Sequence, residues 1–173
     1  MKHKEKHIIL FLTLAASFIS INAFSQVSPT DSVPPDPARI AVYTIQHMKF
    51  GAFTQGAIGG SVIMSPEGVR TSSGDVTLLT MGIPYNQAIF EIEGIVGSNV
   101  SIMNGPNATL TGSNGGSMSM IIGASSPASP FYISVQPPGR TQINIGATLL
   151  VGSPASNPPG TYNGTFFITF NQE

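Results

Sequence analysis

Few residues of this chain are of the types that do chemistry. After residue 25 the only histidine is His47, and the chain has no cysteine. A single histidine cannot supply a two-histidine metal site, and no spacing predicts a Ser-His-Asp triad. The lack of cysteine excludes disulfides, thiolate metal sites and a lipoprotein cysteine. We therefore expect His47 to be a surface histidine, or one whose ring is satisfied within a strand-like stretch.

Glu91 and Glu93 are the most suggestive pair of carboxylates. They lie two residues apart in a strand-like stretch, so their side chains share one face. Paired carboxylates can carry general acid–base chemistry or bind calcium. However, they alternate with Phe90 and Ile92, which is the pattern of a strand with one solvated face. We interpret them as that solvated face, with glycosidase or calcium chemistry as the alternative.

The other polar motifs predict no catalytic, cofactor or metal site. Glu67 and Asp75 stand next to turns, where acidic residues are common. The glycine-rich stretch 112–116 is followed by neither Lys-Ser/Thr nor a helix, so it predicts a turn and not a phosphate loop. Beyond residue 25, four Lys or Arg and seven Asp or Glu give a net charge of −3. This charge argues against binding to nucleic acid.

The aromatic residues are Phe and Tyr, and there is no Trp. A sugar-binding platform built on Tyr85 or Tyr132 is an alternative to a purely structural role. Tyr162 follows Gly160 at the entry to the last predicted strand, which favours a tyrosine corner. Phe167 adds an apolar side chain to the polar face of that strand. We expect it to contact a covering loop, and the alternative is an edge that a partner subunit covers.

The first 25 residues are typical of a secretory signal peptide. Three lysines near the start precede an apolar stretch of 14 residues, IILFLTLAASFISI. Ala23 and Ser25 are small residues at the −3 and −1 positions of a cleavage site before Gln26. An uncleaved membrane anchor is the alternative, but the stretch is short for a span of about 20 residues. We predict that residues 1–25 are removed, leaving no membrane span, and that the protein is secreted, periplasmic or at the cell surface.

Residues 26–38, QVSPTDSVPPDPA, form a predicted linker with four prolines. Proline fixes φ and removes a backbone donor, so we expect an extended, polyproline-like chain. Within it, Asp31-Ser32-Val33 is similar to the acceptor of some bacterial O-glycosylation systems, with Ser32 as the candidate. Asn99, Asn107 and Asn163 begin Asn-x-Ser/Thr sequons, which matter only in a source that glycosylates asparagine.

From about Arg39 onward the hydrophobic period is two. Over residues 143–151 the large apolar side chains fall on one face and polar ones on the other, with Leu150 as the exception. This alternation predicts a strand with one buried side, and similar stretches recur at 88–93, 117–122 and 160–170. The sequence therefore predicts one all-β domain over residues 39–173, an antiparallel β-sandwich of immunoglobulin- or pilin-like kind. The predicted core contains Ile143, Ile145, Leu149, Val151, Phe166 and Ile168.

Turn residues separate the weaker strand candidates. Ser65-Pro66-Glu67-Gly68 has Pro at its second position and Gly at its fourth, which predicts a type I turn joining a hairpin. Further breaks are predicted at 104–107, 112–116, 137–139 and 157–160. The weaker strand candidates are 40–48, 57–65, 69–72, 76–80 and 99–103.

Seven motif blocks, taken in order, resemble a known family. They are GGSV from Gly59, SPEGVR from Ser65, SGDVTLL from Ser73, FEIEG from Phe90, SMSM from Ser117, IGATLLVG from Ile145 and GTYNGTF from Gly160. Together they resemble the bacterial secreted family catalogued as domain of unknown function 4402, over roughly residues 48–171. The resemblance implies an exported β-sandwich with fimbrial-subunit-like character and supplies no catalytic residues. One departure is the ending Phe170-Asn171-Gln172-Glu173, where the family pattern places an aromatic nearer the C-terminus.

Two functions from different classes fit these residues. The first is an exported, non-enzymatic structural or adhesin-like protein of the cell surface, which could assemble by strand addition with other surface-protein subunits. The second is a secreted module that binds a glycan or a protein through loops at one end of the sandwich. No motif supports an enzymatic function, a cofactor or a nucleic-acid partner.

Overall fold

The computed structural model describes residues 39–173, and these residues fold entirely into β-strands and connecting loops. No helix in this described part of the chain is long and apolar enough to cross a membrane. The predicted signal peptide, linker and Ser32 lie outside the described residues. The strands are β1 (Ala41–Gln46), β2 (Lys49–Phe50), β3 (Phe53–Met64), β4 (Arg70–Leu78), β5 (Tyr85–Asn86), β6 (Ala88–Glu93), β7 (Asn99–Asn104), β8 (Ala108–Gly112), β9 (Ser117–Ser126), β10 (Phe131–Tyr132), β11 (Thr141–Val151), β12 (Tyr162–Asn163) and β13 (Ile168–Gln172).

The longest regular alternation in the sequence forms the central strand, β11. Its residues Ile143, Ile145 and Leu149 are buried, while Asn144 and Thr148 are half-buried on the opposite face. The predicted register is therefore confirmed. One edge of β11 pairs first with β6 and then with β3, and the other edge pairs with β9.

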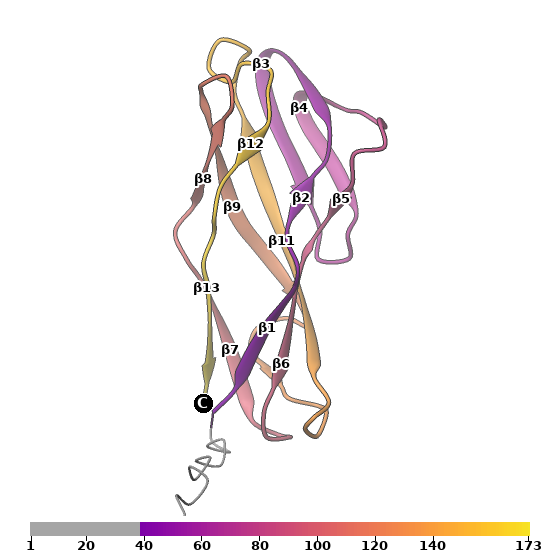
Figure 1. Cartoon of the computed structure of the whole chain (residues 1–173), viewed down its shortest axis with the longest axis vertical. Coiled ribbons are helices and arrows are strands. Elements are labelled where there is room, and N and C mark those ends of the chain that lie inside the picture. Colours follow the sequence, from indigo (N-terminus) through magenta and orange to yellow (C-terminus); the bar gives the residue numbers. More distant parts are fainter. Residues whose placement is uncertain (1–38) are drawn as a thin grey trace, which may run out of the picture. The chain divides into compact units, whose positions relative to one another are not determined.

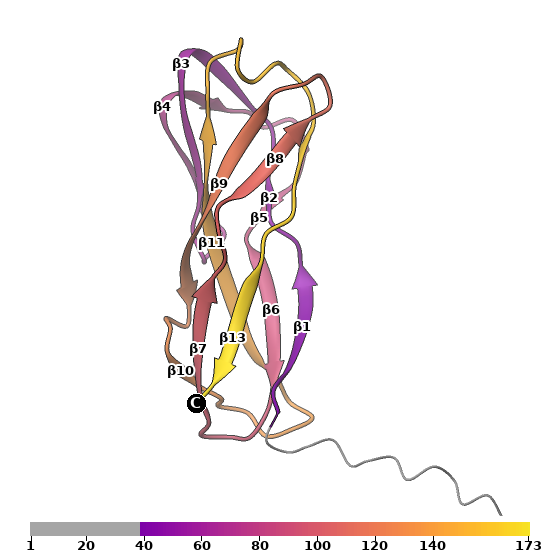
Figure 2. The same cartoon turned by 90° about the vertical axis from the view of Figure 1, so that its left-hand side faces the viewer.

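The strands form an all-β antiparallel sandwich, as predicted. The main sheet has the order β1-β6-β11-β9-β8-β12, and β3 pairs with both β11 and β4. Two smaller sheets consist of β10-β7-β13 and β2-β5. The main sheet curls, so that its edge strands β1 and β12 lie in front of β9 and β11 in Figure 1. In the lower half of Figure 2, β13 lies beside β7, and β6 and β1 follow on the other side of β13.

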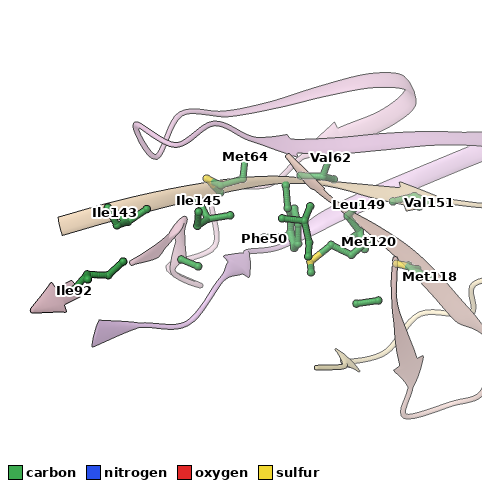
Figure 3. Packing of buried hydrophobic residues seen from close by; sticks show 14 of the residues in the cluster. Phe50, Val62, Met64, Ile92, Met118, Met120, Ile143, Ile145, Leu149 and Val151 are labelled. Carbon is green, nitrogen blue, oxygen red and sulfur yellow. The ribbon is translucent and has the colours of Figure 1, made fainter. Parts of the chain in front are cut away.

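One hydrophobic cluster fills the space between the layers (Figure 3). Its side chains alternate along the strands, because every second residue of a strand points to the same side. The large side chains that are least exposed are Met64, Ile92, Ile133, Ile143, Ile145, Leu149, Val62 and Val100. The cluster thus joins strands from the beginning, middle and end of the domain.

The predicted hairpin turn at Ser65–Gly68 joins β3 to β4. The Gly68 amide donates to the Ser65 carbonyl at 3.0 Å, and Gly68 has a φ of +80°, which glycine adopts without strain. The predicted break between 69–72 and 76–80 is wrong, because β4 runs unbroken from Arg70 to Leu78. The partner strand takes up the irregularity, since the β3–β4 register shifts between Gln55 and Gly60.

The C-terminal segment also differs from the prediction of one continuous strand. It forms β12 and β13, and the residues between them belong to no strand. The break has a physical cause, because β12 pairs with β8 of the main sheet whereas β13 pairs with β7 of the smaller sheet. At the crossing, a Cβ on Gly164 would lie 2.5 Å from the Thr109 carbonyl oxygen, so only glycine allows this approach.

Phe166 and Ile168 are less buried than predicted. Both side chains point to the expected side of the segment, but both are only half-buried. The other four predicted core residues, Ile143, Ile145, Leu149 and Val151, are buried. The difference arises because Phe166 lines an open cleft, described below, instead of a closed interior.

Candidate functional site

His47 and the carboxylates form no catalytic or metal centre among the described residues. His47 is exposed between β1 and β2, and its carbonyl accepts a hydrogen bond from the Asn86 side chain at 2.6 Å. Within residues 39–173, no group of three or more His, Asp or Glu side chains could hold a metal ion. The predicted turn at 112–116 is confirmed: Gly112 ends β8, residues 113–116 lead to β9, and the Gly115 amide donates to the Gly112 carbonyl at 3.2 Å.

Glu91 and Glu93 share one face of β6, and the structure adds a partner that the sequence did not reveal. Arg140 donates to Glu91 at 3.3 Å and to Glu93 at 3.5 Å. Its guanidinium also lies 3.6 Å from the ring centroid of Tyr43. Desolvation lowers the pKa of Arg140, but the hydrogen bonds to Glu91 and Glu93 and the charge interactions with Tyr43 and Glu91 raise it, and the net pKa lies above the usual value. Glu91 and Glu93 therefore accept hydrogen bonds from Arg140 in a partly exposed ion-pair cluster.

Replacing both carboxylates, Glu91→Gln and Glu93→Gln, is expected to leave stability almost unchanged. Exposed ion pairs contribute little, and surface substitutions usually change stability by less than about 0.5 kcal/mol. Thermal melting with and without calcium checks this, with Glu67→Gln as an exposed control. A calcium-dependent rise in melting temperature that only the double variant abolishes would contradict it.

A cleft of about 990 Å³ is lined by residues of β1, β2, β3, β6, β8, β9, β11 and β12 and of the loops between them. Two runs of consecutive residues contribute most of this lining. We call residues 47–55, together with Thr44, the N-terminal wall, and Pro158–Phe166 the C-terminal wall. Core side chains from other strands line its base, which we call the floor: Phe90 and Leu110 are half-buried, whereas Met118, Met120 and Leu149 are only 2–4% exposed.

Both walls present strand edges that have no partner among the described residues. On the N-terminal wall, β1 pairs only with β6, β2 pairs only with β5, and the start of β3 pairs only with β4. On the C-terminal wall, β12 pairs only with β8. Unpaired edges offer rows of backbone donors and acceptors to an added strand. The residues that line the cleft therefore include strand edges without a partner among residues 39–173 on both walls, together with the apolar side chains of the floor.

The inner face of β1 is also uncovered. Val42 stands opposite Ile92 in the β1–β6 ladder, so the two side chains lie on the same side of the sheet. Ile92 is fully buried, whereas Val42 is 44% exposed. Phe90, on the neighbouring strand β6, lines the cleft. Its ring packs edge-to-face with the ring of Phe170, with 5.7 Å between the ring centroids. Among residues 39–173, no strand thus covers the inner side of β1 at Val42.

Arg70 holds the N-terminal wall in place. Its guanidinium donates to the carbonyls of Phe50 at 2.9 Å, Ala52 at 3.1 Å and Leu79 at 3.1 Å. It also lies 4.2 Å from the ring centroid of Tyr85. These contacts tie the wall residues to β4 and β5, so the open edge is preorganised by a residue that does not itself line the cleft.

Tyr162 and Asn157 hold the C-terminal wall. The Tyr162 hydroxyl donates to the Pro158 carbonyl at 2.7 Å, four residues upstream, which confirms the predicted tyrosine corner. The buried Asn157 side chain donates to the Ser117 carbonyl at 2.6 Å and accepts from the Gly152 amide at 2.5 Å. The Asn157 carbonyl in turn accepts from Gln55 of the opposite wall at 2.7 Å.

The substitution Arg70→Ala is expected to lower the free energy of unfolding by about 1.5–3 kcal/mol, the usual contribution of hydrogen bonds to a charged group. The carbonyls of Phe50, Ala52 and Leu79 would lose the guanidinium as a donor, with the Ala52 carbonyl still accepting from the Leu79 amide, and the N-terminal wall would lose its anchor. Urea unfolding followed by fluorescence of the tyrosines measures the change. Arg140→Ala removes an exposed arginine and is expected to have a smaller effect; an equal loss for both variants would contradict the anchoring role.

Tyr85 and Tyr132 are the two rings considered for a sugar-binding platform. Tyr85 lies in the β2–β5 sheet, where the Arg70 guanidinium stacks over its ring, whereas Tyr132 lies in β10 of another sheet. The two candidate sugar-binding rings therefore belong to different sheets. Phe167 is 69% exposed, so the predicted contact with a covering loop is wrong, and the alternative of a partner-covered edge stays a prediction.

Comparison with known proteins places the chain in a family. The family model described as Domain of unknown function (DUF4402) matches residues 40–171. The chain belongs to the DUF4402 family. The match begins eight residues before the predicted start of the resemblance, so it includes β1 as well as the strands that carry the motifs. No curated protein matches, and no solved structure matches.

Proposed function

We propose that this DUF4402 protein is an exported, non-enzymatic structural or adhesin-like protein of the cell surface that assembles by strand addition. The observation that carries the proposal is the cleft, in which strand edges without a partner in the described part of the chain flank an apolar floor. In strand addition, main-chain hydrogen bonds supply affinity and alternate side-chain pockets supply specificity. The cleft offers both kinds of contact.

The length of the cleft sets the length of the strand that could bind in it. Phe90 lies level with Ile143 in the β6–β11 ladder, and Leu149 lies six residues further along β11. Six residues of a strand span about 20 Å. The added strand therefore needs six or seven residues, with an apolar side chain at every second position facing the floor.

The composition of the cleft favours recognition of apolar groups and backbone over acid–base chemistry. Its only ionisable side chains among the described residues are His47, Lys49 and Tyr162, and the Tyr162 hydroxyl is engaged at the tyrosine corner. Met48, Met118 and Met120 contribute flexible side chains, which adapt readily to a bound apolar surface. These features support a binding role for the cleft.

The test uses cells that export the protein and a pair of matched threonine variants. Thr54 is exposed on the N-terminal wall, and Thr71 is exposed on β4 outside the cleft. Electron microscopy of material sheared from the surface is expected to show filaments or oligomers for the parent protein and for Thr71→Asp, and monomers for Thr54→Asp. Soluble monomers of the parent protein that bind a glycan array would contradict assembly and favour the binding-module alternative.

A further inference from the structure

The chain itself contains a segment that matches the cleft. Resting on the proposed function, we propose that residues 26–38 of another copy of this protein occupy the cleft as the added strand. These residues precede the sandwich and lie outside the described residues. Thirteen extended residues span about 40 Å, which exceeds the roughly 20 Å between the levels of Phe90 and Leu149.

The side chains of this segment suit an apolar, aromatic cleft. Positions 27, 29, 33 and 35 carry Val, Pro, Val and Pro, whereas positions 28, 30 and 32 carry Ser, Thr and Ser. Residues separated by an even number of positions lie on the same face of an extended strand, so the two valines and two prolines share one face. Within residues 27–33 only Pro29 lacks a backbone N–H, so the other residues of this stretch can donate ladder hydrogen bonds as an added strand. The cleft supplies aromatic rings from Phe53, Phe90, Tyr162 and Phe166.

The charges are also complementary. Residues 26–38 carry Asp31 and Asp36 and no Lys or Arg. Among residues 39–173, the lining of the cleft includes Lys49 and no carboxylate. Asp31 shares a face with Val27, Pro29 and Val33, so it is the one departure from the apolar pattern on that face, and Lys49 at the border of the cleft carries the opposite charge.

The placement of the ends favours a neighbouring copy as the donor. β1 begins at the end of the sandwich where β13 finishes, whereas the loop that leads into the C-terminal wall lies at the opposite end (Figures 1 and 2). A segment that leaves one copy at its β1 end and enters the cleft of the next makes a head-to-tail contact. Such contacts repeat from copy to copy and build an open chain of subunits.

Disulfide trapping tests the occupant, because the chain has no native cysteine. The exported protein carrying Val33→Cys is mixed with protein carrying Thr54→Cys, and the matched control pairs Val33→Cys with Thr71→Cys. Disulfide-linked dimers are expected to be at least tenfold more abundant with Thr54→Cys. Equal cross-linking with both threonine variants would overturn the proposal. So would a disulfide within single chains of the Val33→Cys/Thr54→Cys variant without dimers in the mixture.

A second measurement separates this proposal from the proposed function. A synthetic peptide of residues 26–38 is expected to reduce assembly of the exported protein, and the same peptide with Val27→Ser and Val33→Ser is expected not to. In the full chain, Val27→Asp with Val33→Asp is expected to abolish assembly as Thr54→Asp does. If Thr54→Asp abolishes assembly but the double valine variant assembles normally, another segment fills the cleft; the occupant is then wrong and the proposed function stands.

Discussion

Truncation of the chain after Asn157 is expected to leave the domain unfolded or aggregated. The change removes β12, β13 and the whole C-terminal wall. It also removes the tyrosine corner and the Phe170 contact with Phe90. Four half-buried side chains, Tyr162, Phe166, Ile168 and Phe170, pack against the core. Full burial of each would contribute about 1.5–3 kcal/mol, so half-burial of all four approaches the lower end of a domain's net stability, about 5 kcal/mol.

Thermal melting of the truncated protein checks this expectation. A synthetic peptide of residues 158–173 is expected to restore a cooperative transition, because β12 and β13 can pair again with β8 and β7. A truncated protein that melts cooperatively at the full-length temperature would show that the C-terminal segment is dispensable, and the C-terminal wall of the cleft would lose its structural basis.

The substitution Leu149→Ala is expected to lower the free energy of unfolding by about 2–5 kcal/mol. Leu149 is 2% exposed and lies between Val62 of β3 and Met120 of β9 in the ladder of the central strand. Alanine would leave a cavity that the paired strands cannot fill without distortion. Leu150 is the matched control, since it is the next residue and is 42% exposed on the opposite face.

Urea unfolding of Leu149→Ala and Leu150→Ala measures the contrast. The midpoint is expected to fall strongly for Leu149→Ala and to change little for Leu150→Ala, with the same slope for both. A larger loss for Leu150→Ala would mean that the faces of β11 are inverted, because a shift of one residue turns every side chain of a strand to the other side.

The sequence predicts β11 and the hairpin turn at Ser65–Gly68 well, because their signals are local. Alternation over β11 determines which side chains are buried, and the Pro and Gly positions determine the turn. β8 was not predicted: Ala108–Gly112 is short and has only one large apolar side chain, Leu110. It becomes a strand because β9 and β12 pair with it on either side.

The features of the candidate site depend on contacts between distant residues, so the sequence could not reveal them. Arg140 meets carboxylates 47 and 49 residues away. Arg70 reaches carbonyls on the wall 18 and 20 residues earlier. The cleft itself results from the curl of the main sheet and from the break between β12 and β13. Alternation correctly predicts the side to which Phe166 points, but it cannot say whether another strand covers that side.

Hydrogen exchange of backbone amides gives the most direct test of strand addition into the cleft. Residues 164–166 lie on the C-terminal wall and belong to no strand, so their amides are expected to exchange rapidly in the monomer. In assembled material they are expected to become protected, while amides on the open edge of β4, outside the cleft, keep their monomer rates. Unchanged exchange at residues 164–166 in assembled material would contradict strand addition at this cleft.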